Sequence, residues 1–103
     1  MLRYFLLIAA AAACTDVCTV KEELGTSTWR LLHAMVEHVE ATPANEQRFQ
    51  SLIRSLEHLY PCEECREHIS EYISNRRVEM TEKFMCDFHN SVNIRLNKPI
   101  YDC

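Results

Sequence analysis

Two cysteines three residues apart, Cys62 and Cys65, are the residues of this sequence best suited to carry chemistry. They follow Pro61, and proline fits the first turn of a helix because its missing N–H would have no partner there. We therefore expect both thiols in the opening turns of a helix, where the positive end of the helix dipole favours a thiolate. Glu63 and Glu64 oppose that effect. The pattern predicts a disulfide that opens and closes, although zinc sites use the same spacing.

A second group of chemically capable residues follows in the segment 86–93. Cys86, His89 or Asn90, and then Asn93 recur at three- and four-residue steps, so they would line one face of a helix beside its apolar face. Imidazole and amide groups offer both donors and acceptors, which suits a bound ligand with many hydrogen-bonding edges. Polar packing between helices would use the same stripe, and both interpretations stay open on this pattern alone.

The cysteines and histidines also allow metal chemistry. Haem attachment needs a histidine directly after the second cysteine, and Arg66 stands there, which excludes that motif. Zinc stays open, because C-x-x-C-x-x-H and C-x-x-H are metal-like spacings. The ligands would lie inside periodic helices, however, and not on the tight turns that structural zinc sites favour. The alternative function is therefore a non-catalytic helical module held by zinc or structural disulfides, with ligands from Cys62, Cys65, His68, Cys86 and His89.

Four amphipathic helices are expected to position these residues. Serine, threonine and proline mark their starts, because a hydroxyl caps a helix and proline fits its first turn. No segment of this region alternates with period two, and a single glycine is too few for a β fold rich in tight turns. The sequence therefore predicts an all-α fold, an antiparallel four-helix bundle. The expected helices begin at 26–28, 43, 61 and 81 and end near 40, 60, 74 and 96.

Apolar residues at helical spacing predict the core of this bundle. The segment Asn75 to Met80 is expected as a polar link, and residues 100–103 as an extended tail. The predicted stripes are Trp29, Leu32, His33, Val36 and Val39 in the first helix, Phe49, Leu52, Ile53, Leu56, Leu59 and Tyr60 in the second, Ile69, Tyr72 and Ile73 beside the cysteines in the third, and Met85, Phe88, Val92 and Leu96 in the fourth.

The N-terminal residues 1–13 have the build of a secretory signal peptide, with Arg3 ahead of an apolar run. A comfortable membrane span needs roughly 20 residues, so a short anchor is the weaker interpretation. The segment 14–23 is expected to be mobile. Its Cys14 and Cys18 are either incidental or a flexible thiol pair that carries electrons from a substrate to the C-x-x-C pair.

Length and composition place the chain among small single domains. Its 103 residues are 48% hydrophobic, enough for one core that is only marginally stable without staples or a partner. The 15 acidic and 11 basic side chains give a formal charge of −4 without a basic cluster, so nothing supports nucleic-acid binding. Six cysteines in so short a chain favour a compartment where disulfides persist, or a metal site.

Taken together, the motifs resemble the Erv/ALR family of FAD-linked sulfhydryl oxidases. The resemblance spans residues 24–103 with all spacings in order. It rests on Leu24-Gly25, Ser27-Thr28-Trp29, Leu32-His33, the run from Tyr60 to Cys65, and the run Cys86-x-x-His89-Asn90-x-Val92-Asn93-x-x-Leu96-x-Lys98-Pro99-x-x-Asp102-Cys103. Such a set in register is far more specific than any one of its parts.

The resemblance implies a small four-helix bundle that holds FAD at one end and usually pairs into a homodimer. It implies the oxidation of protein thiols to disulfides, with electrons passing to FAD and then to O2, giving H2O2; cytochrome c is another acceptor. The short helical tail that family members usually add is not expected here. The signal-like start favours the endoplasmic reticulum lumen or the secretory pathway, and the mitochondrial intermembrane space is the alternative.

The resemblance also implies roles for individual residues. Cys62 and Cys65 match the catalytic pair, with Cys65 nearer the flavin and Cys62 exchanging with incoming thiols. Cys86 and Cys103 match a structural disulfide, which would close a loop of roughly 17 residues and contribute on the order of 3 kcal/mol. No metal is implied. The positions that match the FAD site are Gly25, Trp29, His33, Tyr60, Cys86, His89, Asn90, Val92, Asn93, Lys98 and Tyr101.

Overall fold

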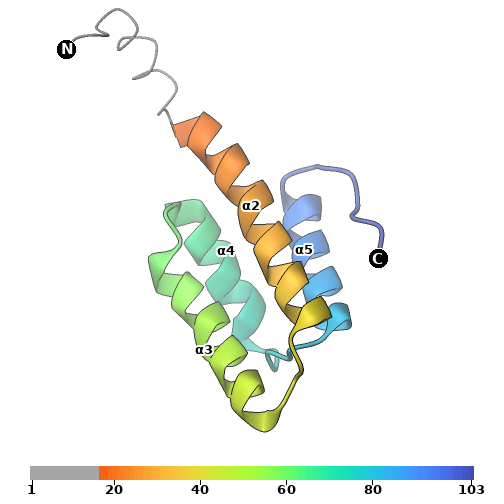
Figure 1. Cartoon of the computed structure of the whole chain (residues 1–103). Coiled ribbons are helices and arrows are strands. Elements are labelled where there is room, and N and C mark those ends of the chain that lie inside the picture. The colour runs from red at the N-terminus through yellow and green to blue at the C-terminus, as the bar shows by residue number, and fades with distance from the viewer. Residues whose placement is uncertain (1–16) are drawn as a thin grey trace, which may run out of the picture. The chain divides into compact units, whose positions relative to one another are not determined.

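The computed structural model of the chain describes residues 17–103, with side chains from residue 21 onward. This part of the chain holds four helices and no strand, which confirms the all-α prediction (Figure 1). The signal-like residues 1–13 and Cys14 lie outside the described residues. The helices are α2 (Val17–His38), α3 (Pro43–Leu59), α4 (Glu63–Ser74) and α5 (Glu82–Arg95).

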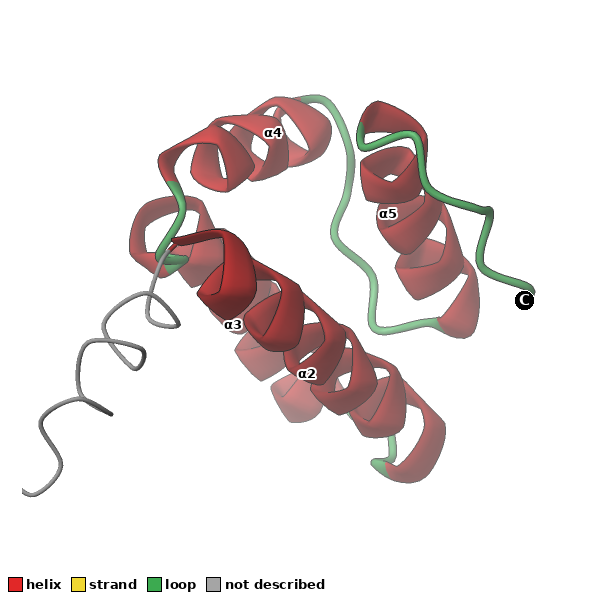
Figure 2. Ribbon diagram, turned by 90° about the horizontal axis from the view of Figure 1, so that it is seen from above, coloured by secondary structure: helices red, strands yellow, loops and turns green. Residues whose placement is uncertain are grey.

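The chain divides within α2 into two compact units, the second of which is Leu31–Cys103. This unit contains the end of α2, the other three helices and the C-terminal tail. A long loop joins α4 to α5, and the tail folds back beside α5 (Figure 2). None of the helices in the described residues is long and apolar enough to cross a bilayer.

The start of α2 differs from the prediction. The helix begins at Val17, and it passes through Gly25 and the hydroxyl residues that we expected to cap it. Glycine in a helix interior costs only about 1 kcal/mol relative to alanine, so a helix can continue through it. Thr26 and Ser27 are exposed helix positions. The helix therefore includes residues 17–23, a large part of the segment that we expected to be a mobile link.

The predicted starts of α3 and α5 are confirmed, because each depends on a local cap. The Thr42 hydroxyl accepts the N–H of Asn45 at 3.1 Å, and Pro43 occupies the first position of α3. The Thr81 hydroxyl accepts the N–H of Phe84 at 3.0 Å. Both caps satisfy N–H groups that have no partner inside the helix.

The start of α4 corrects the sequence prediction by two residues. Proline disfavours a helical backbone in the residue before it, and Tyr60 is extended, with φ −66° and ψ 128°. Cys62 is also extended, with φ −160° and ψ 112°, and it caps α4 instead of lying in its first turn. Pro61 therefore belongs to a turn between α3 and α4, and only Cys65 of the two cysteines is helical.

The core joins α3, α4 and α5 through aromatic side chains. Tyr72 stacks on Phe88 with ring centroids 5.1 Å apart, and Phe84 lies 5.7 Å from Phe88 and 6.4 Å from Phe49. Gln50 donates its side-chain N–H to the Val78 carbonyl at 3.0 Å and so fixes the link to α3. The buried apolar side chains of the helices and links are Leu32, Phe49, Ile53, Ile69, Tyr72, Ile73, Val78, Met80, Phe84, Met85 and Phe88.

Several predicted core positions are wrong at the ends of helices. Val39, Leu59 and Leu96 are 46%, 74% and 49% exposed. Leu59 is the last residue of α3, and Val39 and Leu96 follow the last residues of α2 and α5, so the apolar period continues to the helix ends, where these side chains face solvent. Conversely, Val78 and Met80 are buried in the segment predicted as a polar link, because that link crosses the core.

The burial pattern makes a testable distinction within α3. Ile53→Ala should lower the free energy of unfolding by about 2–5 kcal/mol, because it leaves a cavity at a side chain with no exposure. Leu59→Ala, the matched control in the same helix, should change it by no more than about 0.5 kcal/mol. Urea denaturation followed by circular dichroism measures both. Equal losses in the two variants would show that the end of α3 is packed.

Candidate functional site

A disulfide joins Cys62 to Cys65 where α4 begins, with Cα atoms 5.2 Å apart. The Cys62 sulfur accepts the N–H of Cys65 at 3.3 Å, the bond that a capping hydroxyl would normally make. The same N–H and the positive end of the helix dipole would stabilise a sulfur anion at Cys62 once the disulfide is opened. The arrangement suits a disulfide that exchanges with thiols.

The turn ahead of this disulfide is held by a residue that sequence reasoning missed. The Arg66 guanidinium donates to the Tyr60 carbonyl at 2.6 Å, and the Cys62 N–H donates to the same oxygen at 2.8 Å. The Arg66 N–H also donates to the Cys62 carbonyl at 2.9 Å. A signal existed, because an arginine four residues after a helix cap can reach back to the preceding turn.

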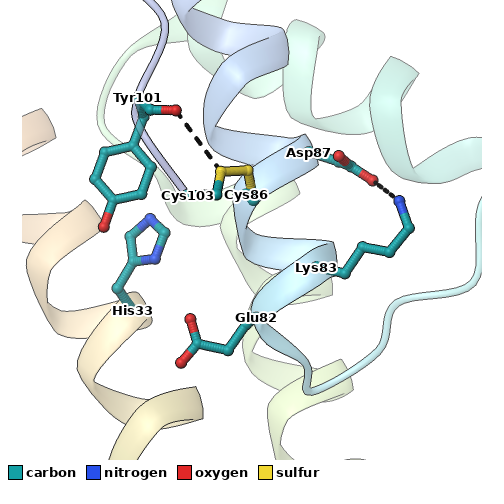
Figure 3. A pocket seen from close by; sticks show the side chains of 7 residues that line it. All are labelled: His33, Glu82, Lys83, Cys86, Asp87, Tyr101 and Cys103. Carbon is teal, nitrogen blue, oxygen red and sulfur yellow. Dashed lines mark hydrogen bonds and ion pairs between the residues drawn. A yellow bond between two sulfur atoms is a disulfide. The ribbon is translucent and has the colours of Figure 1, made fainter.

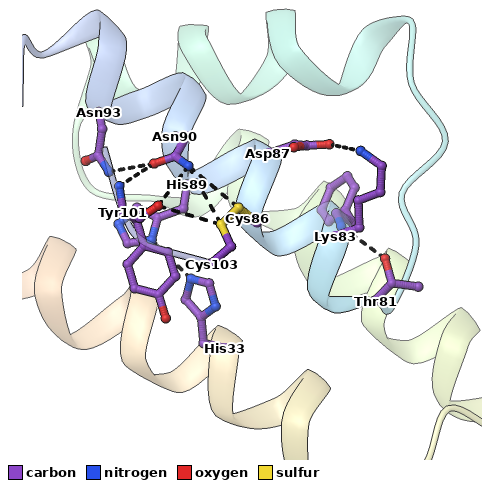
Figure 4. The surroundings of a disulfide bond; sticks show 11 residues. His33, Thr81, Lys83, Cys86, Asp87, His89, Asn90, Asn93, Tyr101 and Cys103 are labelled. Carbon is purple, nitrogen blue, oxygen red and sulfur yellow. Dashed lines mark hydrogen bonds and ion pairs between the residues drawn. A yellow bond between two sulfur atoms is a disulfide. The ribbon is translucent and has the colours of Figure 1, made fainter. Parts of the chain in front are cut away.

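A second disulfide joins Cys86, in α5, to Cys103, as the resemblance implies (Figure 4). The two Cα atoms are 6.0 Å apart, and the residues are 17 positions apart in the sequence. The bond ties the C-terminal tail to the N-terminal half of α5. It therefore places tail residues beside the polar face of that helix.

The amide of Asn90 holds the tail in register with α5. Its Oδ1 accepts the N–H of Tyr101 at 2.7 Å, and its Nδ2 donates to the Tyr101 carbonyl at 3.2 Å (Figure 4). The buried Asn93 donates to Asn90 Oδ1 at 3.2 Å and, through its own carbonyl, accepts the Lys98 N–H at 2.8 Å. Two residues of the polar stripe predicted on this helix, Asn90 and Asn93, thus join α5 to the tail.

Three rings from three separate segments meet beside the second disulfide. The Tyr101 ring lies 4.7 Å from the His33 ring and 4.6 Å from the His89 ring, between centroids. His33 Nε2 and His89 Nδ1 are 3.0 Å apart, a hydrogen bond that needs one donor and one acceptor. At least one of the two imidazoles must therefore be neutral.

The environment of the two histidines favours the neutral forms. Burial lowers the pKa of His89 to about 4, and repulsion from His33 and Lys98 adds to that effect. Burial also lowers the pKa of His33, although Glu82 and Glu37 act in the opposite direction. Both shifts agree with a hydrogen bond between uncharged rings.

A cavity of about 280 Å³ opens at this cluster (Figure 3). The sequence analysis missed its three charged residues, Glu82, Lys83 and Asp87, of which Lys83 and Asp87 form an ion pair at 2.8 Å. Their positions three and four residues before Cys86, and one after it, place them around the same end of α5. The lining residues are His33, Glu82, Lys83, Cys86, Asp87, Tyr101 and Cys103.

The structure brings several residues of the predicted site together within its second unit. Tyr60 lies in the turn beside the first disulfide, and Val92 is half-buried in α5. Gly25 and Trp29 lie on α2 before Leu31, and Cys18 lies near the start of that helix. The predicted residues that meet at the tail of the second unit are His33, Cys86, His89, Asn90, Asn93, Lys98, Tyr101 and Cys103.

The ligands that the zinc alternative needs do not converge. Cys62, Cys65 and Cys86 are all in disulfides, and His68 is within 3.2 Å of the Ser91 hydroxyl. Among the residues whose side chains the structure describes, no group of three or more histidine, cysteine or acidic side chains could hold a metal ion.

Comparisons with known proteins agree with these features. The sequence model of the Erv1 / Alr family matches residues 26–103. The chain is 36% identical over 89 residues to the mitochondrial FAD-linked sulfhydryl oxidase ERV1 of Saccharomyces cerevisiae, covering 80% of this chain and 47% of that protein. It is 37% identical over 90 residues to the FAD-linked sulfhydryl oxidase ERV1 of Oryza sativa subsp. japonica, covering 81% and 46%. The chain spans about half the length of these relatives.

A solved structure shows the same fold. The FAD binding domain of Erv1 from Saccharomyces cerevisiae matches with a TM-score of 0.70 and 32% sequence identity. The match covers 80% of this chain and 85% of that domain. The helices that carry both disulfides are thus arranged as in a known flavin-binding fold.

The lowered pKa of His89 predicts a loss of stability in acid. Between pH 6.5 and about 4, the unfolded chain binds a proton at His89 that the folded chain does not, so the free energy of unfolding should fall as the pH falls through this window. His89→Asn should make that fall shallower. Urea denaturation of the FAD-free protein at several pH values measures it, with His58→Asn on the exposed face of α3 as the matched control. The same pH dependence in His89→Asn and the parent chain would contradict the prediction.

Proposed function

The chain belongs to the Erv1 / Alr family, as its motifs predicted, and we propose that it is an FAD-dependent sulfhydryl oxidase that forms disulfides in protein thiols. The observation that carries the proposal is the Cys62–Cys65 disulfide, which caps α4 in a fold shared with a flavin-binding domain. The names of the two relatives support the same activity. The zinc alternative has no comparable support.

The residues beside the second disulfide fit a flavin nucleotide. FAD has two flat ring systems, and the His33, His89 and Tyr101 rings offer flat faces beside a cavity. Its diphosphate needs donors, and Lys98 supplies a cation near His89. We propose that FAD is held by these residues together with Gly25, Trp29, Tyr60, Cys86, Val92 and Asn93, and that Asn90, the remaining matched position, belongs to the same site.

The protein's own part of the reaction is thiol–disulfide exchange. A substrate thiolate attacks the Cys62 sulfur, the Cys62–Cys65 bond breaks, and the Cys65 sulfur leaves as a thiolate. A second substrate thiolate then attacks the mixed disulfide, so that the substrate gains a disulfide and Cys62 is released. Two substrate thiols have lost two electrons, and the cysteine pair holds them as a dithiol. The Arg66 bond to Tyr60 keeps the turn before Cys62 in place during the exchange.

FAD, when bound, supplies the electron chemistry that returns the cysteine pair to a disulfide and delivers two electrons to O2 as H2O2. Cytochrome c is an alternative acceptor. The chain's residues bind and orient the cofactor. Removal of Cys65 should therefore stop turnover even where FAD is retained.

The division of labour between the two cysteines rests on the resemblance alone. It assigns Cys62 to exchange with substrate and Cys65 to the flavin side. In the isolated chain Cys62 is 9% exposed and Cys65 is the more accessible of the two. A substrate that reaches Cys62 would thus have to approach along the Tyr60–Cys62 turn, where Pro61 is exposed.

The partners and the compartment extend the proposal. We expect a homodimer, protein thiols as substrates, and a role for Cys14 and Cys18 as a shuttle between substrate and the catalytic pair. An oxidising compartment agrees with the disulfides of the second unit. The signal-like residues 1–13 favour the endoplasmic reticulum lumen. The names of two relatives support a mitochondrial location, for which the intermembrane space is the alternative that we propose.

The proposed function predicts a yellow protein. The purified chain reconstituted with FAD should show flavin absorbance in the visible range and should consume oxygen when dithiothreitol is added. Cys65→Ser should keep the absorbance and lose at least about 100-fold in oxygen uptake, because no dithiol can form at the pair. A folded chain that stays colourless with excess FAD would overturn the proposal.

The assigned roles of the two cysteines predict different trapping behaviour. With a small peptide cysteine supplied as a disulfide with a thiol leaving group, the Cys62 thiolate of Cys65→Ser should attack the peptide sulfur, release the leaving thiol and accumulate a mixed disulfide, because no neighbouring thiol resolves it. Cys62→Ser should accumulate far less. Mass spectrometry after acid quenching measures both variants, and dominant trapping on Cys65 would reverse the assignment.

A further inference from the structure

We propose that Asn90 is a positioning residue, which acts on the flavin site by clamping the C-terminal tail and not by binding the cofactor. This inference rests on the proposed function, and it changes the role that the family resemblance implies for Asn90. In this interpretation the segment Lys98–Cys103, called the strap below, forms one wall of the FAD site. Asn90 fixes the position of that wall through its hydrogen bonds to Tyr101.

The Asn90 amide makes its hydrogen bonds within the chain. Its Oδ1 has two lone pairs, which accept the Tyr101 N–H at 2.7 Å and the Asn93 amide at 3.2 Å. Its Nδ2 has two hydrogens, of which one serves the Tyr101 carbonyl at 3.2 Å. The other faces sulfur, 3.6 Å from Cys86 and 3.9 Å from Cys103. Three of the four hydrogen-bonding positions of the amide are therefore used by Tyr101 and Asn93, and the fourth points at the disulfide.

Tyr101 lies on the strap between two other points of attachment to α5, at Lys98 and Cys103. Three attachments hold the strap to α5: the Lys98 N–H on the Asn93 carbonyl at 2.8 Å, the two Asn90 bonds to Tyr101, and the Cys103 disulfide. Only the middle attachment grips the Tyr101 backbone from both sides. The Asn90 amide bonds to both the N–H and the carbonyl of Tyr101, as a neighbouring strand would. These two bonds fix the backbone of Tyr101 and therefore the direction of its side chain.

The direction of the Tyr101 side chain places its ring in the cluster with His33 and His89. The Tyr101 ring stacks on the His89 ring and lies tilted beside the His33 ring. Tyr101 and Cys103 line the cavity together with His33 (Figure 3). Without the clamp the disulfide would still tether Cys103, but Tyr101 could rotate out of the ring cluster. The cavity would then lose one wall, and a bound flavin would dissociate more easily.

A double-mutant cycle separates the clamp from a direct contact with FAD. Asn90→Ala and Tyr101→Ala should each weaken FAD binding by about tenfold, which corresponds to the loss of one or two hydrogen bonds or a ring contact. If Asn90 acts through Tyr101, the double variant should bind FAD no more than about twofold more weakly than either single variant. Titration of the FAD-free protein, followed by flavin fluorescence, measures the four dissociation constants of the parent chain and the three variants. Ile94→Ala, an exposed position on the same helix, is the matched control.

A measurement without FAD tests the clamp by itself. Asn90→Ala should speed the reduction of the Cys86–Cys103 disulfide by a phosphine at least about fivefold, because the strap opens more often. Alkylation and mass spectrometry assign the reduced cysteines. Asn90→Asp keeps the acceptor but loses the donor, and it should show both effects if the alanine variant does not fold.

The outcomes are distinct. A double variant that weakens binding about a hundredfold, with additive effects, would make Asn90 a direct ligand and overturn the inference. An unchanged rate of disulfide reduction would also overturn it. Failure of the parent chain to bind FAD would instead contradict the proposed function, and the reduction rate alone would then decide whether Asn90 clamps the strap.

Discussion

The Cys86–Cys103 disulfide joins a tail with no helix or strand of its own to the N-terminal half of α5. Such a tail buries little apolar surface, and Ile100 is 58% exposed, so it could not stay in place through hydrophobic contacts. The covalent bond confines it, and the Asn90 amide then selects one register among the few that remain. The His33–His89–Tyr101 cluster depends on both, because one of its three rings comes from the tail.

The two disulfides of the second unit close loops of different size, and this difference suits one to opening during exchange and the other to holding the tail. Cys62 and Cys65 are three residues apart, so opening their bond releases no long segment, and the position of α4 still depends on Ile69 and Ile73 in the core. That bond can therefore open and close in each cycle without unfolding. The Cys86–Cys103 bond spans 17 residues, and its loss would free the tail.

The small core also explains how the catalytic turn is held. α4 begins directly after Cys62, and aromatic contacts between Tyr72, Phe84 and Phe88 fix its far end against α5. At the near end, the Arg66 bond to the Tyr60 carbonyl joins the end of α3 to the start of α4. The disulfide thus sits on a rigid helix terminus, where one N–H and the helix dipole face the reacting sulfur.

The sequence by itself determined the features that depend on neighbours within about four residues along the chain. The caps at Thr42 and Thr81, the Cys62–Cys65 pair and most of the core stripes belong to this group. The order of motifs also determined the family. The sequence predicted helix limits wrongly where a local signal is weak. Gly25 resembles a helix boundary, but α2 continues through it because glycine costs a helix only about 1 kcal/mol.

Only the tertiary structure decided which long-range partners those residues have. His33 and His89 are 56 positions apart, and nothing in the spacing of either predicts a hydrogen bond between them. Asn90 had the residue type of a ligand contact, but its amide is used by Tyr101, 11 positions away. The physical reason is the same in both cases. A polar side chain bonds to whichever group the fold brings within about 3 Å, and that choice is made by the path of the chain, which local sequence does not encode.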